Sequence, residues 1–333
     1  MIMTNVTTMS GFLLKGFSDD HELQILHALL FLVIYLLALA GNIIIITITT
    51  LDQGLQSPID YFLKHLSLLD LTFISVTVPQ SIDNSLADNG HISYGQCILQ
   101  VFFFTSLAWA EMAILTVMSY DRYAAICLPL NYEVIVDTRK CKWFVLAVWL
   151  SGGISGILYT AATFSITFCR ANTIHHFFCD VPQLSKLSCS NDNMGVIGVS
   201  LFVSVIAFIC FIFIIFSYIH IFYTVLRIHS AGGQSKVYST CLPHLFVVSF
   251  SLCTGVFAYL KPTSDSPTAS DLVASIFYTV IPPALNPIIY SLRNETMKAA
   301  LRKLLLGKKL TRKKTCFLHC RWMSNTMHKE LFE

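Results

Sequence analysis

Apolar windows of about 20 residues recur along the chain, separated by short polar segments. A helix needs ~20 apolar residues to cross ~30 Å of hydrocarbon, so the pattern predicts an all-α membrane protein, a seven-transmembrane helix bundle. We expect spans near residues 26–49, 61–81, 98–123, 143–164, 196–226, 239–260 and 272–290. Hydropathy alone supports the second and sixth least, because one contains Lys64, His65 and Asp70 and the other is rich in Ser, Thr and Cys.

The basic residues predict the orientation of the chain. With the N-terminus outside, 4 of the 22 Lys and Arg residues are extracellular and 18 are cytoplasmic. The extracellular four are Lys15, Arg170, Lys186 and Lys261. Because cytoplasmic loops are enriched in Lys and Arg, we expect a multi-pass plasma-membrane protein with residues 1–25 outside and residues 291–333 inside.

Both terminal segments carry further signals. The first ten residues are polar and lack the basic and apolar regions of a cleaved signal peptide. Asn5 begins an Asn-Val-Thr glycosylation sequon, which can also be a chance match. Residues 297–306 predict a short amphipathic helix on the membrane surface. The basic run at residues 308–314 is expected either to contact anionic membrane lipids or to be simply solvated.

Composition supports the membrane assignment and excludes several other classes. The 333 residues are 55% hydrophobic and 12% charged, whereas soluble domains have about 25% charged residues. The 11 cysteines include no Cys-x-x-Cys pair, so no zinc site is indicated. Enzyme signatures such as HExxH, GxSxG and the P-loop are absent, and we expect neither an enzyme nor a nucleic-acid partner. A proton-coupled transporter is a rival interpretation, but no internal repeat supports it.

Ionisable groups inside predicted spans are costly and usually mark function. At about 1.5 Å per residue, Glu111 lies ~16 Å outward from Arg122 and Asp70 lies ~14 Å from the start of its oppositely directed helix. Asn286 lies ~10 Å from the cytoplasmic face by the same measure. With the hydroxyls of Ser67, Ser75 and Ser119, these oxygens can bind a structural sodium ion or water. The alternative is that Asp70 and Glu111 are unrelated buried acids, one or both protonated.

Asp121 and Arg122 are adjacent at a predicted helix end. A local ion pair there can hold the guanidinium until the helix bundle rearranges, which would make a switch. The alternative is a helix-end pair with no switching role, since exposed pairs contribute little.

Several sequence motifs, in the same order along the chain, resemble those of a known family. Residues 118–130 (MSYDRYAAICLPL) resemble the MAYDRYVAICHPL signature of olfactory (odorant) receptors, which are rhodopsin-like G-protein-coupled receptors. Residues 282–294 (PPALNPIIYSLRN) resemble the family's PPxLNPxIYSLRN segment, and residues 236–245 (KVYSTCLPHL) its KAFSTCxSHL segment. Gly41-Asn42, residues 66–70 (LSLLD) and Ser217-Tyr218 also fit. The resemblance covers about residues 10–300.

The resemblance implies a pocket for a small, mostly apolar odorant in the outer half of the bundle. Helical spacing on the third, fifth and sixth spans supplies most of its candidates, although each can equally be core packing. They are Phe104, Thr105, Ala108, Trp109, Phe202, Ile206, Leu252, Gly255, Val256, Tyr259 and Thr279. Tyr259 is the strongest, because it offers a hydroxyl from an apolar wall.

The resemblance also implies activation of a stimulatory G protein, which raises cyclic AMP. The residues expected to serve coupling and switching are Asp121, Arg122, Tyr123, Tyr218, His244, Asn286, Pro287 and Tyr290. A non-olfactory rhodopsin-like receptor is the nearest rival. It would need an anchoring charge in the outer pocket, where the third span instead offers Phe104 and Thr105.

Four cysteines face the oxidising side in the predicted topology: Cys97, Cys169, Cys179 and Cys189. They allow three pairings. The resemblance implies Cys97 with Cys179 and Cys169 with Cys189, and Cys97 with Cys189 is the alternative. The neighbouring His175-His176 pair can suggest metal binding, but is more simply read as polar loop residues.

The chain departs from the family pattern at a few positions. Asp60 stands where the family's PMYFFL segment has a tyrosine, which places an acid at the start of the second span. Leu128 replaces the usual histidine, Pro243 a serine, and Leu252 a common aromatic residue. These departures are expected to affect signalling strength and surface expression, and not the fold.

Overall fold

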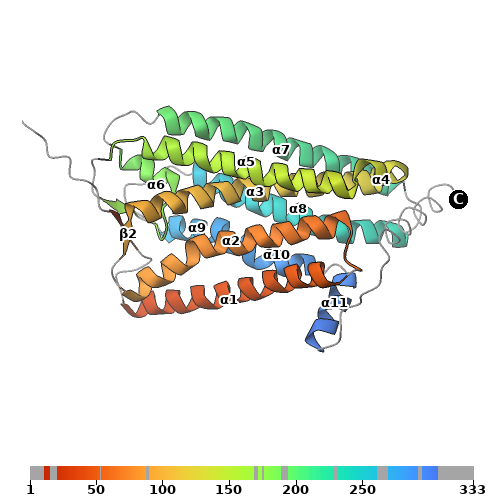
Figure 1. Cartoon of the computed structure of the whole chain (residues 1–333), viewed down its shortest axis with the longest axis horizontal. Helices are drawn as coiled ribbons and strands as arrows, with labels where there is room; N and C mark the ends of the chain where they lie inside the picture. The colour runs from red at the N-terminus through yellow and green to blue at the C-terminus, as the bar shows by residue number, and fades with distance from the viewer. Residues whose placement is uncertain are drawn as a thin grey trace, which may run out of the picture.

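Long helices lying side by side along one axis make up most of the computed structural model (Figure 1). It describes residues 11–15, 21–52, 54–87, 90–168, 172–174, 176–188, 194–227, 231–260, 269–291 and 295–306. The bundle helices are α1 (His21–Leu51), α2 (Pro58–Ala87), α3 (Tyr94–Cys127), α5 (Thr138–Phe164), α7 (Met194–Leu226), α8 (Ala231–Leu260), α9 (Ala269–Thr279) and α10 (Ile281–Ser291). With α9 and α10 taken together, they provide the seven helical segments that the sequence predicts.

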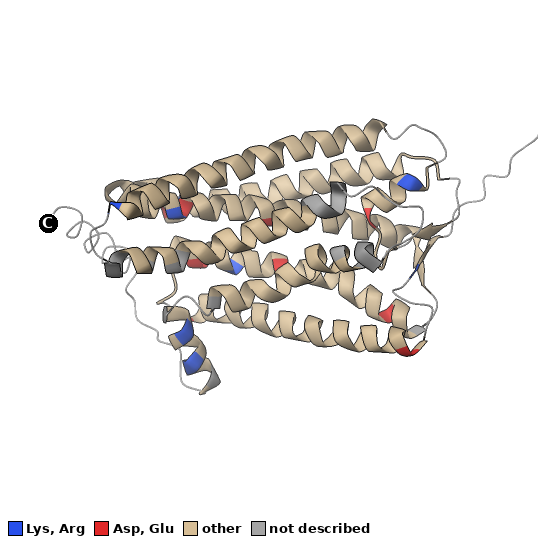
Figure 2. Cartoon of the chain, turned by 180° about the vertical axis from the view of Figure 1, so that it is seen from behind, with Lys and Arg blue, Asp and Glu red and all other residues tan. Residues whose placement is uncertain are grey.

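Five of these helices, α1, α2, α3, α5 and α7, are long and apolar enough to cross a membrane. In α8 the apolar stretch is shorter, Cys241–Gly255, in keeping with its Ser- and Thr-rich sequence. Large apolar side chains are exposed along α1 and α7, as expected where lipid replaces water around a bundle. Charged residues are sparse along the bundle and recur at its ends and in α11 (Figure 2).

The seventh segment is two helices and not the single span expected over residues 272–290. The helix α9 ends at Thr279, and α10 begins at Ile281 with Pro282 and Pro283 in its first turn. Proline has no backbone N–H and suits the first turn of a helix, where that donor is not needed, but it interrupts a longer one. The bond from Val280 N to Ile276 O, at 2.9 Å, closes α9 before the break.

A small sheet, which the sequence analysis did not predict, lies at one end of the bundle. Its central strand β1 (Gly11–Leu14) pairs antiparallel with β2 (His91–Ser93) and parallel with β3 (Thr173–Ile174). A Cβ on Gly11 would lie 2.3 Å from Ile92 O, so the close approach of β1 and β2 requires glycine. We call this end of the bundle the sheet end.

Short helices complete the two ends. The helix α6 (Val181–Lys186) lies at the sheet end (Figure 1). At the opposite end, the 3-10 helix η1 (Pro129–Asn131) and α4 (Tyr132–Ile135) follow α3, and α11 (Glu295–Leu305) follows α10. We call this the α11 end. Met297 and Ala300 of α11 are buried, while Arg302 and Lys303 occupy its last turn. The short helix expected over residues 297–306 is therefore present.

The helix α3 packs against α2, α5, α7 and α8 and therefore lies at the centre of the bundle. Small residues of α5 allow it to approach α3 closely. A Cβ on Gly152 would lie 2.7 Å from Ser106 O, and one on Gly156 would lie 2.8 Å from Phe102 O. Ser93 caps the start of α3 and exchanges bonds with Gln96, which fixes where the helix begins below the sheet. One helix thus runs from the sheet end to the α11 end.

Candidate functional site

A disulfide fixes the loop between α5 and α7 to the start of α3. It joins Cys97 and Cys179, which is the pairing that the resemblance implies and which rules out the alternative of Cys97 with Cys189. Cys169 and Cys189 lie outside the described residues, so their pairing stays a prediction. The disulfide places the residues around Cys179 directly over the outer half of α3.

Gln100 strengthens this attachment, one turn after Cys97. Its Oε1 accepts a hydrogen bond from Cys179 N at 2.8 Å, and its Nε2 donates to Val76 O of α2 at 2.9 Å. The amide therefore connects the loop, α3 and α2, and its polar atoms are satisfied although it is buried. The sequence analysis missed Gln100, although an amide inside an apolar span was the available signal.

Phe177 and Phe178 carry the loop into the bundle, and both are fully buried. The Phe178 ring lies 5.0 Å from Phe104 of α3 and 6.4 Å from Tyr278 of α9, between ring centroids. The Phe177 ring lies 5.7 Å from Phe31 of α1. An aromatic layer from three helices and the loop therefore covers the region where Phe104 was expected to line a pocket.

Asp180 and Tyr278 connect the same loop to α9, since the Tyr278 hydroxyl donates to Asp180 Oδ2 at 2.9 Å. Burial raises the pKa of the Asp180 carboxyl, while His176 and the Tyr278 bond act against that rise. His176 lies in the loop, as expected, and is buried there against Phe177 and Phe178. His175 is not among the described residues. In the part of the chain that the structure describes, no three His, Cys, Asp or Glu side chains gather as a metal site would require.

The expected pocket residues fall into three groups. Phe104, Thr105 and Thr279 are buried near the sheet end, while Ala108, Trp109, Ile206, Leu252 and Gly255 are partly buried. Phe202 is 58% exposed on the outer surface of α7, so it does not line the interior as expected. Its helical spacing was compatible with either face, and the direction in which α7 packs decided between them. Val256 and Tyr259 belong to α8, but their side chains are outside the described part.

The two hydroxyls expected in the pocket bond to their own helices. Thr105 Oγ1 donates to Val101 O at 2.8 Å, and Thr279 Oγ1 donates to Ser275 O at 2.5 Å. This arrangement satisfies both donors inside an apolar layer. Each oxygen can still accept a bond from a ligand, because a hydroxyl has two lone pairs.

Asp70, Glu111 and Asn286 come together in the middle of the bundle. Asn286 Nδ2 donates to both carboxylate oxygens of Asp70, at 3.2 and 3.0 Å. Asp70 and Glu111 are close enough to interact electrostatically. Glu111 Oε1 and Asn286 Oδ1 are buried, and neither has a hydrogen-bond partner among the described residues. Uncompensated buried oxygens of this kind fit a hard cation such as sodium or an ordered water.

The three serine side chains expected beside these acids differ in their burial and hydrogen bonds. Ser67 is buried, and Ser119 donates to Thr116 O at 2.8 Å. Ser75 is exposed and donates to Leu71 O at 2.7 Å, so its expected place in the cluster was wrong. Its position along α2 was right, but the rotation of that helix turns the side chain toward α1, where its hydroxyl lies 3.2 Å from that of Tyr35.

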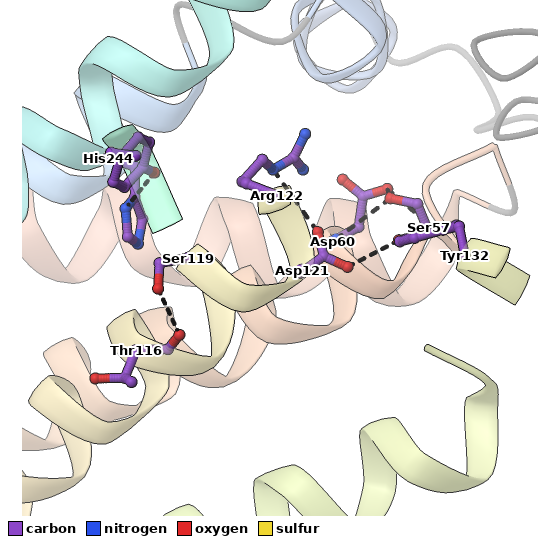
Figure 3. A network of polar contacts seen from close by, with 9 residues as sticks. Ser57, Asp60, Thr116, Ser119, Asp121, Arg122, Tyr132 and His244 are labelled. Carbon is purple, nitrogen blue, oxygen red and sulfur yellow. Dashed lines mark hydrogen bonds and ion pairs between the residues drawn. The ribbon is translucent and has the colours of Figure 1, made fainter. Parts of the chain in front are cut away.

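Arg122 lies near the α11 end among several polar side chains (Figure 3). Its Nε lies 3.7 Å from Asp121 Oδ2, and the Tyr132 hydroxyl donates to Asp121 Oδ1 at 2.8 Å. The predicted ion pair between Asp121 and Arg122 is therefore present, with a third partner in Tyr132 that the sequence analysis missed. Asp60 and Ser57 lie close to this group in the same view.

The other expected switch residues surround this region on α7, α8 and α10. The Tyr218 hydroxyl and His244 Nδ1 are 2.7 Å apart and hydrogen-bonded. The Tyr290 hydroxyl is buried, with no hydrogen-bond partner within the described residues. Tyr123 instead faces α7, where its ring lies 6.0 Å from that of His220. The structure thus joins Tyr218 to His244 but leaves Tyr123 apart from them.

Pro287 packs against α1, because a Cβ on Gly41 would lie 2.9 Å from Pro287 Cβ. Asn42 Nδ2 donates to Pro283 O at 3.0 Å and to Ala38 O at 3.0 Å. The motif residues Gly41 and Asn42 therefore hold the interrupted seventh segment against the first.

Comparisons with known proteins agree with this arrangement. The family described as "Olfactory receptor" matches residues 31–308. Human olfactory receptor 14J1 is 63% identical over 314 residues, covering 94% of this chain and 98% of the relative, and human olfactory receptor 14A16 is 53% identical, covering 93% and 100%. The crystal structure of squid rhodopsin superposes with a TM-score of 0.69 at 15% identity, covering 95% of this chain and 93% of that one, which shows the shared seven-helix fold. The chain belongs to the olfactory receptor family and is an odorant receptor of the G-protein-coupled class.

Proposed function

We propose that this receptor binds a small, mostly apolar odorant below the aromatic layer at the sheet end and activates a stimulatory G protein at the α11 end. The receptor resides in the plasma membrane with the sheet end extracellular. The disulfide supports this orientation, because such bonds persist in oxidising compartments. The basic last turn of α11 supports a cytoplasmic position beside anionic membrane lipids.

The observation that carries the proposal is the continuity of α3. Phe104, at its sheet end, contacts the loop residue Phe178, and Arg122, at its other end, pairs with Asp121. A ligand that favours one arrangement of the sheet end can therefore bias the other end through a single rigid helix. Agonist binding is then a population shift between two arrangements of the bundle.

In the active arrangement, the α11 end of α8 moves outward and opens a cleft for a G-protein helix. Arg122 leaves Asp121, and the Tyr218–His244 bond breaks or exchanges partners. The buried Tyr290 hydroxyl, which has no hydrogen-bond partner in the described part of the chain, becomes available to a new partner. The outcome is stimulatory G-protein activation and a rise in cyclic AMP.

A sodium ion at Asp70 and Glu111 would stabilise the silent arrangement. Glu111 Oε1 and Asn286 Oδ1 supply the oxygen ligands, and Asp70 supplies charge. Binding a cation there neutralises two neighbouring acids that would otherwise repel each other. The same cluster can instead bind a proton, so the site is expected to respond to sodium concentration and to pH.

The decisive experiment is a screen of a chemically diverse odorant panel on cells that express the receptor, with cyclic AMP as the readout. Once an agonist is found, Phe104→Ala should shift its potency by about tenfold or more, whereas Phe202→Ala should not. These two phenylalanines form a matched pair, one buried and one exposed. Surface labelling controls for expression. An agonist that signals without cyclic AMP contradicts the coupling, and equal effects of both substitutions contradict the pocket.

A further inference from the structure

Asp60, at the start of α2, is a buried acid. Its side chain is only 5% exposed, although carboxylates are rarely buried without compensation. Its Oδ2 accepts bonds from Ser57 Oγ at 2.5 Å and from Ser57 N at 3.3 Å. Tyr61 N donates to Ser57 O at 3.1 Å, so Ser57 occupies the capping position of the helix. One function of Asp60 is therefore to complete a helix cap.

The helix cap uses one carboxylate oxygen of Asp60 and does not explain the position of the other. Within the described residues, both bonds from Ser57 use Oδ2, which leaves Oδ1 available. Asp60 lies beside the Asp121–Arg122–Tyr132 group (Figure 3) and interacts electrostatically with both Asp121 and Arg122. A second buried acid thus lies near the guanidinium, although no ion pair joins the two among the described residues.

Arg122 has room for a second acidic partner. Its ion pair with Asp121 joins Nε to Oδ2 at 3.7 Å, and Tyr132 already occupies the other oxygen of Asp121. A guanidinium has five N–H donors, and the Arg122 side chain is only 14% exposed, so water satisfies it poorly. In the described part of the chain, Asp121 is the only acid within ion-pair distance of Arg122.

We propose that Asp60 is a second acidic partner of Arg122, which acts together with Asp121 to hold the receptor in its silent arrangement. The proposal rests on the proposed G-protein function. When Arg122 moves toward the cleft between α3 and α8, it leaves both acids behind. The attraction to Asp60 is then lost, and Asp60 and Asp121 repel each other without an intervening cation. Asp60 therefore raises the free energy of the active arrangement relative to the silent one.

Four substitutions separate this role from helix capping. Asp60→Asn removes the charge but keeps an oxygen that can accept the Ser57 bond, and Asp60→Glu keeps the charge. Ser57→Ala removes the cap but keeps the acid. Asp52→Asn is the matched control, because Asp52 is equally buried at the same end of the bundle but lies 4.0 Å from Lys303 and not beside Arg122.

We expect Asp60→Asn to raise basal cyclic AMP per surface receptor about two- to fivefold, the range expected for a weak charge pair. Asp60→Glu, Ser57→Ala and Asp52→Asn should leave basal signalling per surface receptor unchanged. If Asp60→Asn and Ser57→Ala both lower surface expression equally and neither raises basal signalling, Asp60 is a cap only and the proposal is overturned.

A second measurement does not depend on the G protein. A fluorophore placed by a noncanonical amino acid at the exposed Ser235, near the start of α8, reports the opening of the α11 end in purified receptor. Asp60→Asn should shift its signal toward the agonist-bound value in the absence of any ligand, and Asp52→Asn should not. If the fluorescence of Asp60→Asn does not shift, the proposal for Asp60 is overturned. A shift without a cyclic AMP change in cells supports Asp60 and contradicts the stimulatory coupling.

Discussion

Asn286 Nδ2 donates hydrogen bonds to both carboxylate oxygens of Asp70, which ties α10 to the middle of α2. If a cation or proton shares this site, Asp70→Asn should abolish the dependence of the agonist response on sodium and pH. The measurement is the agonist potency at matched ionic strength with sodium replaced by a large organic cation. Ser75→Ala serves as the control, because Ser75 lies on the same helix but its hydroxyl bonds to Leu71 O and Tyr35. A sodium dependence that survives in Asp70→Asn sinks the shared site.

The Cys97–Cys179 disulfide should be needed for a stable sheet end. It closes a loop with a sequence separation of 82 residues, for which the chain-entropy account gives about 4.5 kcal/mol. Cys97→Ser, Cys179→Ser and the double substitution should lose surface expression to the same extent, since each removes the same bond. Cys210→Ser, at a free cysteine of α7, should be nearly neutral. Strong additivity between the two substitutions would argue against a shared bond.

Glycine at position 156 should be required for the contact between α5 and α3. A Cβ there would lie 1.9 Å from Ser106 Oγ and 2.8 Å from the backbone oxygen of Phe102. Gly156→Ala should therefore destabilise the receptor by about 1–3 kcal/mol through overpacking. Gly153→Ala provides the comparison on the same helix, because nothing lies within 4 Å of its added Cβ. Thermal unfolding in detergent should show a lower midpoint for the first variant only.

The stability of the sheet end should depend on pH through Asp180. Burial raises the pKa of its carboxyl, so the native state holds this proton more tightly than the unfolded chain. The contribution to stability is greatest at low pH and falls as pH rises above about 4, the ordinary Asp range. Asp180→Asn should flatten that part of the profile in thermal unfolding of purified receptor. His176 and Tyr278 also face Asp180, and an unchanged slope in Asp180→Asn would assign the dependence to other groups.

The long helices and the order of the motifs could be predicted because each rests on a continuous stretch of sequence. The position of Asn286 beside Asp70 followed from counting residues along helices that cross the same membrane. The break at Val280 was foreseeable in kind, since Pro282 and Pro283 cannot donate the bonds that a continuous helix needs. Rotation about a helix axis was not foreseeable, and for that reason Phe202 and Ser75 are exposed against expectation.

Contacts between distant short segments could not be predicted from sequence. The strands have two to four residues each and are too short for an alternating pattern to be recognised. The insertion of Phe177 and Phe178 depends on the disulfide and on Gln100, which together determine where the loop enters. Tyr132 meets Asp121 only because the chain turns back after α3.

The pairing of β1 also bears on how the receptor is made. Because β1 is the middle strand, it cannot complete its hydrogen bonds until the ribosome has synthesised Thr173 and Ile174, which lie about half of the chain later. Until then the strand that carries Phe12, which is buried in the finished protein, can pair on one side only, with β2. An epitope tag joined ahead of Gly11 therefore risks slowing maturation more than the same tag attached beyond α11.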